Sequence, residues 1–255
     1  MRRREKFVLT ALILSVLLFV VQLVDISYRY WAILVFTIGT YLLSAWALME
    51  DLQKHEFLTI LPLPALYALS ISLFNLFVPT NWLSRVLLFT SFALGMYAIL
   101  LSSNIFSVAK ARTIQLLYAA QAISLFFTLL ISFLFTSTIF SLKLPIWMIV
   151  PLVGASHFPL VFSSIWSVKL QPRIDREEVL ISLLPTLVVM QFALVFSFLP
   201  LEVWLVALLV MALLYLYLNF THSYLRGRLF EKTVKEYLIV AASIWVLFVI
   251  FFPGK

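Results

Sequence analysis

Long apolar stretches separated by short polar segments run along the whole chain. A helix that crosses a bilayer needs about 20 mainly apolar residues, within a range of about 17–25. Nine candidate stretches occupy residues 7–24, 30–49, 57–78, 86–103, 114–136, 145–168, 179–199, 203–221 and 238–253. The pattern predicts an all-α fold, a polytopic integral membrane bundle of about nine transmembrane helices. The alternative is eight spans, with one weak stretch re-entrant.

The polar segments alternate between many and few positive charges. If the N-terminus is cytoplasmic, fourteen of the 18 Lys and Arg residues fall on the cytoplasmic side. The four on the outer side are Arg29, Arg85, Lys143 and Lys255. Because cytoplasmic loops carry an excess of Lys and Arg, the pattern predicts the N-terminus inside and the C-terminus outside.

The chain shows a weak internal repeat at an offset of 121 residues. The matched pairs are Pro64 with Pro185, Pro79 with Pro200, and Glu56 with Glu177. Within a single transmembrane domain over 1–255, the repeat predicts four-helix units at 30–144 and 145–255, preceded by an extra first helix at 7–29. An even number of spans in each unit makes the repeats parallel, related by an axis along the membrane normal.

Composition narrows the class of protein. The chain is 64% hydrophobic and 11% charged, against about 25% charged residues in soluble domains. Its net charge of +7 is spread over short loops, which indicates topogenic charge and attraction to lipid headgroups rather than a nucleic-acid partner. The expected location is the cytoplasmic (inner) membrane of a bacterium. The expected partners are the lipid bilayer and either another membrane protein or a second copy of this chain.

Ionisable side chains are nearly absent from the apolar stretches, and His157 is the exception. It lies at the centre of the sixth stretch, between Pro151 and Pro159. Proline lacks a backbone N–H and clashes in a helix interior, so this pair predicts a kinked or broken helix. Gly154 would permit close approach of a neighbouring helix. A broken helix with a polar residue at mid-depth is typical of transporter sites.

Ser156 and Gln191 are the predicted companions of His157 in a ligand-binding site. Gln191 lies at the centre of the seventh stretch, and consecutive helices usually pack together. The alternative is a neutral His157 that hydrogen-bonds a neighbouring helix, with the prolines only shaping the span. Adjacent helix positions point about 100° apart, so Ser156 and His157 are not expected to form a nucleophile–base pair. No catalytic residue is predicted.

Acidic side chains form two clusters on the predicted cytoplasmic side. The first contains Glu50, Asp51 and Glu56, and the second Asp175, Glu177 and Glu178. Adjacent carboxylates can bind Mg²⁺ together with a phosphate, which would suit a lipid-modifying enzyme. Solvated loop charge beside Lys and Arg is the favoured interpretation. Cysteine is absent, and no metal site or cofactor is predicted.

Two segments carry a family resemblance. The segment 100–117 reads Leu-Leu-Ser-Ser-Asn-Ile-Phe-Ser-Val-Ala-Lys-Ala-Arg-Thr-Ile-Gln-Leu-Leu, and 228–238 reads Arg-Leu-Phe-Glu-Lys-Thr-Val-Lys-Glu-Tyr-Leu. Both resemble an uncharacterised multi-pass membrane protein family of small-genome (candidate-phyla) bacteria. The resemblance implies no activity. It implies that Asn104, Arg112 and Lys232 are structural anchors of inner loops.

These features favour a membrane-embedded binding or transport component for an apolar or weakly polar ligand. The alternative is a non-catalytic structural or assembly subunit of a membrane complex, and a lipid-modifying enzyme is the third class. A ligand site predicts that His157, Ser156 and Gln191 converge on one cavity.

Overall fold

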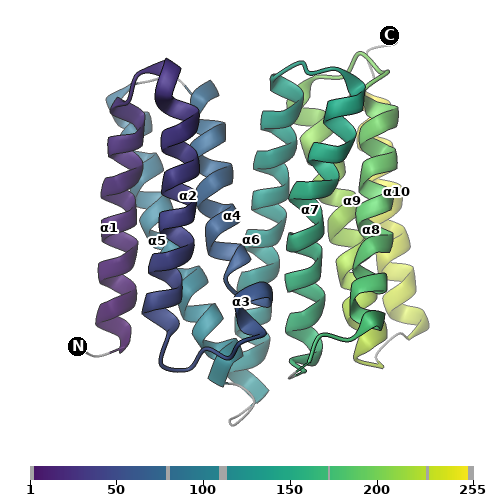
Figure 1. Cartoon of the computed structure of the whole chain (residues 1–255). Helices are drawn as coiled ribbons and strands as arrows, with labels where there is room; N and C mark the ends of the chain where they lie inside the picture. Colours follow the sequence, from purple (N-terminus) through teal and green to yellow (C-terminus); the bar gives the residue numbers. More distant parts are fainter. Residues whose placement is uncertain (1–2, 79–80, 109–113, 172, 228–229, 252–255) are drawn as a thin grey trace. The chain divides into compact units, whose positions relative to one another are not determined.

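The computed structural model describes residues 3–78, 81–108, 114–171, 173–227 and 230–251 (Figure 1). Those residues form helices and their connections, without a strand, so the predicted all-α fold is confirmed for the described part. The helices are α1 (Arg3–Leu23), α2 (Ile26–Leu48), α3 (Glu56–Thr59), α4 (Pro62–Phe74), η1 (Asn75–Phe77), α5 (Trp82–Val108), α6 (Ile114–Ser141), α7 (Ile146–Lys169), α8 (Arg176–Phe196), α9 (Val203–Leu225) and α10 (Glu231–Phe251).

In the described residues, nine segments are long and apolar enough to cross a membrane. The third, Glu56–Phe77, combines α3, α4 and the short η1, and the others are single helices. Nine apolar helical segments of sufficient length are thus confirmed in the described residues, whereas the choice between nine spans and eight with one re-entrant stretch stays a prediction. Several helices extend beyond the predicted limits, because their polar ends continue the helical hydrogen bonding past the apolar stretch.

The interrupted span is the third, not the sixth. α3 ends at Thr59 and α4 begins at Pro62. Proline suits the first position of a helix, because a backbone N–H at that position would have no acceptor within the helix. By contrast, α7 continues without interruption, with Pro151 and Pro159 inside it. Of the predicted kink or break at these prolines, the break is not present, and the kink stays a prediction. Membrane helices tolerate interior proline where neighbouring groups satisfy the freed carbonyls.

The chain divides into two compact units, called here unit 1 (Met1–Phe127) and unit 2 (Thr128–Lys255). The division lies within α6 and assigns α1 to unit 1, whereas the sequence predicted a boundary after residue 144 and a separate first helix. Compactness does not test an internal repeat, so the repeat stays a prediction. One of its markers, Pro79, lies outside the described residues.

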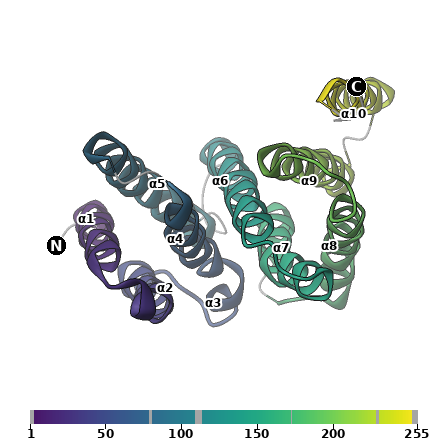
Figure 2. The same ribbon diagram turned by 90° about the horizontal axis from the view of Figure 1, so that it is seen from above.

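Neighbouring helices in each unit pack side by side. In unit 1, α1 packs against α2 and α5, and α4 packs against the same two helices. In unit 2, α7, α8 and α9 contact one another, and α10 stands to the side, against α9 (Figure 2).

Glycines allow close helix approach within both units. In unit 1, a Cβ atom at Gly95 of α5 would overlap the Tyr67 hydroxyl of α4, whose ring stacks on Phe92 with centroids 5.4 Å apart. In unit 2, a Cβ atom at Gly154 would lie 2.6 Å from the Met190 sulfur of α8. The prediction that Gly154 permits close helix packing is thus confirmed.

Candidate functional site

The side chain of His157 is completely enclosed in unit 2. Its Nε2 lies 2.8 Å from the Ser132 hydroxyl of α6, and its Nδ1 lies 2.8 Å from the Val153 carbonyl oxygen. A carbonyl only accepts, so Nδ1–H donates to Val153 and Nε2 accepts the Ser132 hydroxyl proton. Both nitrogens of a neutral imidazole are therefore engaged.

Ser156 lies nearer to His157 than the sequence predicted. Its hydroxyl oxygen is 3.1 Å from Nδ1 of His157, although adjacent helix positions point about 100° apart. The Ser156 hydroxyl also donates to the Val153 carbonyl, at 3.0 Å, so both side chains turn toward one acceptor. Because Nδ1 already holds a proton, it is not available as a base for Ser156.

The structure does not bring Gln191 to His157. The Gln191 side chain is exposed, and the described hydrogen bonds of His157 do not include it. Its neighbour Met190 packs against α7 instead, and Ser132 of α6 takes the place predicted for Gln191. Ser132 did carry a signal, a hydroxyl within an apolar stretch, but serines in such stretches commonly bond to their own backbone.

The hydrogen bonds around His157 are suited to holding α6 and α7 together. In an apolar interior, removing one partner leaves a buried polar atom unsatisfied, at about 1–3 kcal/mol. The imidazole has no ring nitrogen left for a ligand. Of the two interpretations that the sequence left open, this geometry matches the neutral, hydrogen-bonded histidine.

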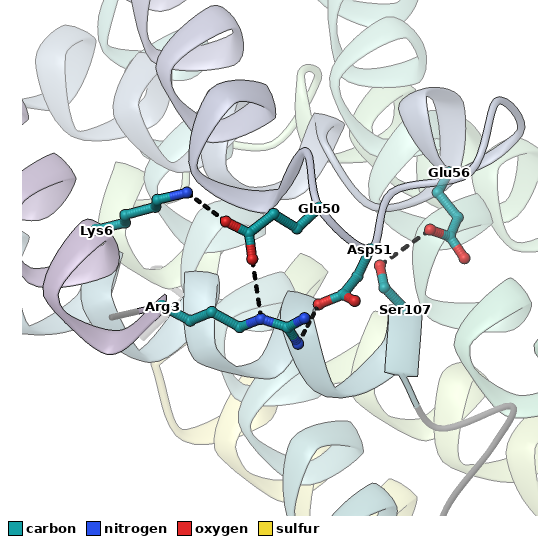
Figure 3. Close-up of polar contacts among 6 residues, drawn as sticks. All are labelled: Arg3, Lys6, Glu50, Asp51, Glu56 and Ser107. Carbon is teal, nitrogen blue, oxygen red and sulfur yellow. Dashed lines mark hydrogen bonds and ion pairs between the residues drawn. The ribbon is translucent and has the colours of Figure 1, made fainter. Parts of the chain in front are cut away.

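An ionic clasp joins the start of α1 to the turn after α2 (Figure 3). Arg3 contacts Glu50 at 3.1 Å and Asp51 at 2.7 Å, and Lys6 also pairs with Glu50. Hydrogen bonds from Lys6 first, and then from Arg3, lower the pKa of Glu50 below its ordinary value of 4.5. These two acids are loop charges beside basic residues, as the sequence predicted.

Glu56 is different, because it is fully buried in the first turn of α3. Its Oε2 accepts hydrogen bonds from the Gln53 N–H at 2.9 Å and from the Ser107 hydroxyl at 3.0 Å (Figure 3). The helix dipole favours a carboxylate at this end, and charge-assisted hydrogen bonds are the strong ones. Glu56 therefore ties the start of α3 to the end of α5.

Glu178 is buried in the first turn of α8, yet neither carboxylate oxygen has a hydrogen-bond partner. The Asp175 N–H and the charge of Lys169 act on this carboxyl group, but neither makes a hydrogen bond of normal geometry to it. Glu177 is 74% exposed and lies 3.6 Å from the Lys169 amine. The prediction of solvated acids is thus wrong for Glu56 and Glu178, because both turn inward beneath the helix start.

Three further residues were implied as anchors of inner loops, and the structure describes the side chain of one of them. Asn104 is half-buried in α5, while Arg112 and the side chain of Lys232 lie outside the described residues. Within the described parts of the chain, no group of three or more His, Asp and Glu side chains is placed to hold a metal ion.

An apolar groove of about 370 Å³ lies between α8, α9 and α10 of unit 2. Its lining includes Phe192, Phe196, Leu209, Ala241, Trp245 and Phe248. The rings of Phe196 and Phe248 face each other across it, with centroids 6.5 Å apart. The volume lies within the range of about 300–1,000 Å³ that is usual for ligand pockets. No signal in the sequence marks this groove, because its residues resemble those of any other apolar stretch in the chain.

Residues 44–251 match the model of a family described as "Protein of unknown function (DUF5656)". The match covers most of the chain, so the chain belongs to this family, which is uncharacterised as the resemblance implied. The apolar groove and the acids of both clusters lie within the matched segment, whereas Arg3 and Lys6 precede it. No curated protein and no solved structure matches the chain.

Proposed function

We propose that this chain is an integral membrane protein that acts as a binding or transport component for an apolar ligand. The observation that carries the proposal is the groove between α8, α9 and α10, whose described walls are apolar. The helices around it have mean hydropathies of 2.0 to 2.4. In a bilayer such a groove opens toward hydrocarbon, so the occupant that matches it is a single acyl or isoprenoid chain.

Packing against aromatic rings would let the groove bind one lipid chain more tightly than the surrounding bilayer does. Lipid tails are as apolar as the groove, so no hydrophobic effect favours binding, and close packing has to supply it. Each carbon–carbon contact contributes only about 0.1–0.2 kcal/mol, so many are needed. Rigid rings such as Phe192, Phe196 and Phe248 offer many contacts at little cost in side-chain entropy.

The orientation is part of the proposal. The distribution of Lys and Arg favours a cytoplasmic N-terminus in a bacterial inner membrane, which puts the groove in the outer half of the bilayer. Because the chain has no cysteine, single cysteines report orientation cleanly. A membrane-impermeant maleimide should label Lys143→Cys in intact cells and Lys54→Cys only after permeabilisation. The reverse pattern would contradict the orientation.

Native mass spectrometry in lipid nanodiscs tests the binding function. We expect one retained lipid on the wild-type protein and at least about tenfold less on Ala241→Phe, which fills the groove with a ring. Ala119→Phe is the matched control, because this exposed residue of α6 makes the same change away from the groove.

Equal retention by both variants would contradict the groove as a binding site. A tightly associated protein with no retained lipid would instead favour the structural or assembly role.

A further inference from the structure

A second pocket, in unit 1, has the opposite chemistry. It has a volume of about 130 Å³ and lies where α1 passes into α2 and where α5 begins. Its lining includes Gln22, Arg29, Asn75, Ser84 and Arg85. Two guanidinium groups and three neutral polar side chains thus meet in one small space, without a carboxylate among the lining residues.

The two arginines lie outside the ion pairs of the described part of the chain, although Asp25 stands directly before α2. Neither Arg29 nor Arg85 makes an ion pair there. Both also stand in the first turns of helices, since α2 begins at Ile26 and α5 at Trp82. Cations are disfavoured at the positive end of the helix dipole, so a bound anion would stabilise both arginines there.

Two donors in the pocket are left unsatisfied. Nε of Arg85 and Nε2 of Gln22 are buried atoms without a hydrogen-bond partner. A buried donor with no acceptor costs about 1–3 kcal/mol, and more when it is charged. An oxyanion bound in the pocket would bring acceptor oxygens to both side chains, which line it.

Arg29 has a structural role as well. Its Nε and Nη2 donate to the Val24 carbonyl at 3.2 and 3.0 Å, and Nη2 also donates to the Gln22 carbonyl at 3.2 Å. These bonds cap the end of α1 and fix the guanidinium in place. Nη1 remains for an anion. Arg85 has no such capping bonds among the described hydrogen bonds, so its role is the sharper test.

We propose that this pocket binds a phosphate group through Arg29 and Arg85. The planar fork of arginine matches the oxygens of phosphate, and Asn75, Ser84 and Gln22 add neutral donors. The pocket lies at the ends of apolar spans, which in a bilayer is the depth of lipid phosphates. The site is separate from the groove of unit 2 and does not depend on it. Arg29 and Arg85 are two of the four basic residues on the predicted outer side. The proposal gives both the same role, which is binding the phosphate.

The test uses the full-length protein, purified and delipidated in a neutral detergent. Its thermal stability is measured against inorganic phosphate and, separately, against dioctanoyl phosphatidylglycerol, each compared with chloride at equal ionic strength. Stabilisation by phosphate alone or by both probes identifies a site for free oxyanions. Stabilisation by the lipid alone identifies a headgroup site. Both support the proposal.

Variants assign the effect to the pocket. Arg85→Gln should raise the apparent dissociation constant at least about tenfold, the loss expected for one charge-assisted contact. Lys143→Gln, which removes an exposed cation from the same predicted side, should leave it unchanged. If Arg85→Gln does not fold, Gln22→Met removes the second unsatisfied donor with little change in shape and should weaken binding severalfold. The proposal would be overturned if neither probe stabilised the protein, or if Lys143→Gln weakened binding as much as Arg85→Gln.

Discussion

Unit 2 contains one region in which every polar group of a buried side chain has a partner, and another in which neighbouring helices leave an open groove. Around His157, both ring nitrogens have partners from α6 and α7. Between α8, α9 and α10, an apolar groove remains unfilled. His157, the polar residue that stands out in the sequence, is fully hydrogen-bonded within the fold, because an unsatisfied polar atom is costly in an apolar interior. An apolar wall carries no such cost and can stay open for a ligand.

The largest expected effect on stability comes from breaking the closed region. His157→Ala should lower the free energy of unfolding by about 2–4 kcal/mol, since it leaves a cavity and removes the acceptor of Ser132. Retention of lipid in the groove should not change. Thermal unfolding in detergent, with native mass spectrometry on the same sample, measures both. If His157→Ala instead lost a bound ligand and unfolded like the wild type, the result would favour the predicted ligand site at His157 over the structural role.

Two buried acids extend the contrast between satisfied and unsatisfied groups. Glu56→Gln should destabilise the protein by about 1–3 kcal/mol, because it weakens charge-assisted bonds from Gln53 and Ser107. Glu178→Gln should be neutral or stabilising, because it removes a buried carboxyl group that has no hydrogen-bond partner. Thermal unfolding of the two variants side by side gives the comparison. Equal destabilisation would show that Glu178 has a partner.

The clasp on the surface of unit 1 should have the smallest effect. The pKa of Glu50 is lowered by Lys6 and Arg3, so its contribution is present above the ordinary carboxyl range and is lost as pH falls through the lowered pKa. Glu50→Gln should therefore melt slightly below the wild type at pH 7 and together with it at the acid end. High salt should also reduce the difference, as for other exposed pairs. A gap that persists in acid would point to a role other than ion pairing.

Some of this architecture follows directly from the sequence. Apolar stretches near bilayer length predicted nine spans, because each must satisfy its backbone internally as a helix. Gly154 predicted a close helix contact, because a residue without a side chain leaves room for a neighbour. These features depend on local composition, which the sequence shows.

Features that depend on helix rotation were not predictable. Whether Gln191 faces α7 or the exterior depends on how α8 turns about its axis, and the nearly uniform hydrophobicity of that helix leaves the rotation open. The inward turn of Glu56 and Glu178 is a property of helix starts that loop composition does not reveal. The groove depends on the separation of α10 from its neighbours, which no residue pattern encodes.

The most direct test of the central claim maps where a lipid chain lies. The wild-type protein in nanodiscs is exposed to a phospholipid with a photoreactive diazirine in its acyl chain, and labelled residues are identified by mass spectrometry. Labelling concentrated on the lining residues of α8 and α10, such as Phe196 and Trp245, and reduced by Ala241→Phe is the predicted result. Labelling spread evenly over exposed residues of other helices, such as Leu12 in α1, would contradict a binding groove.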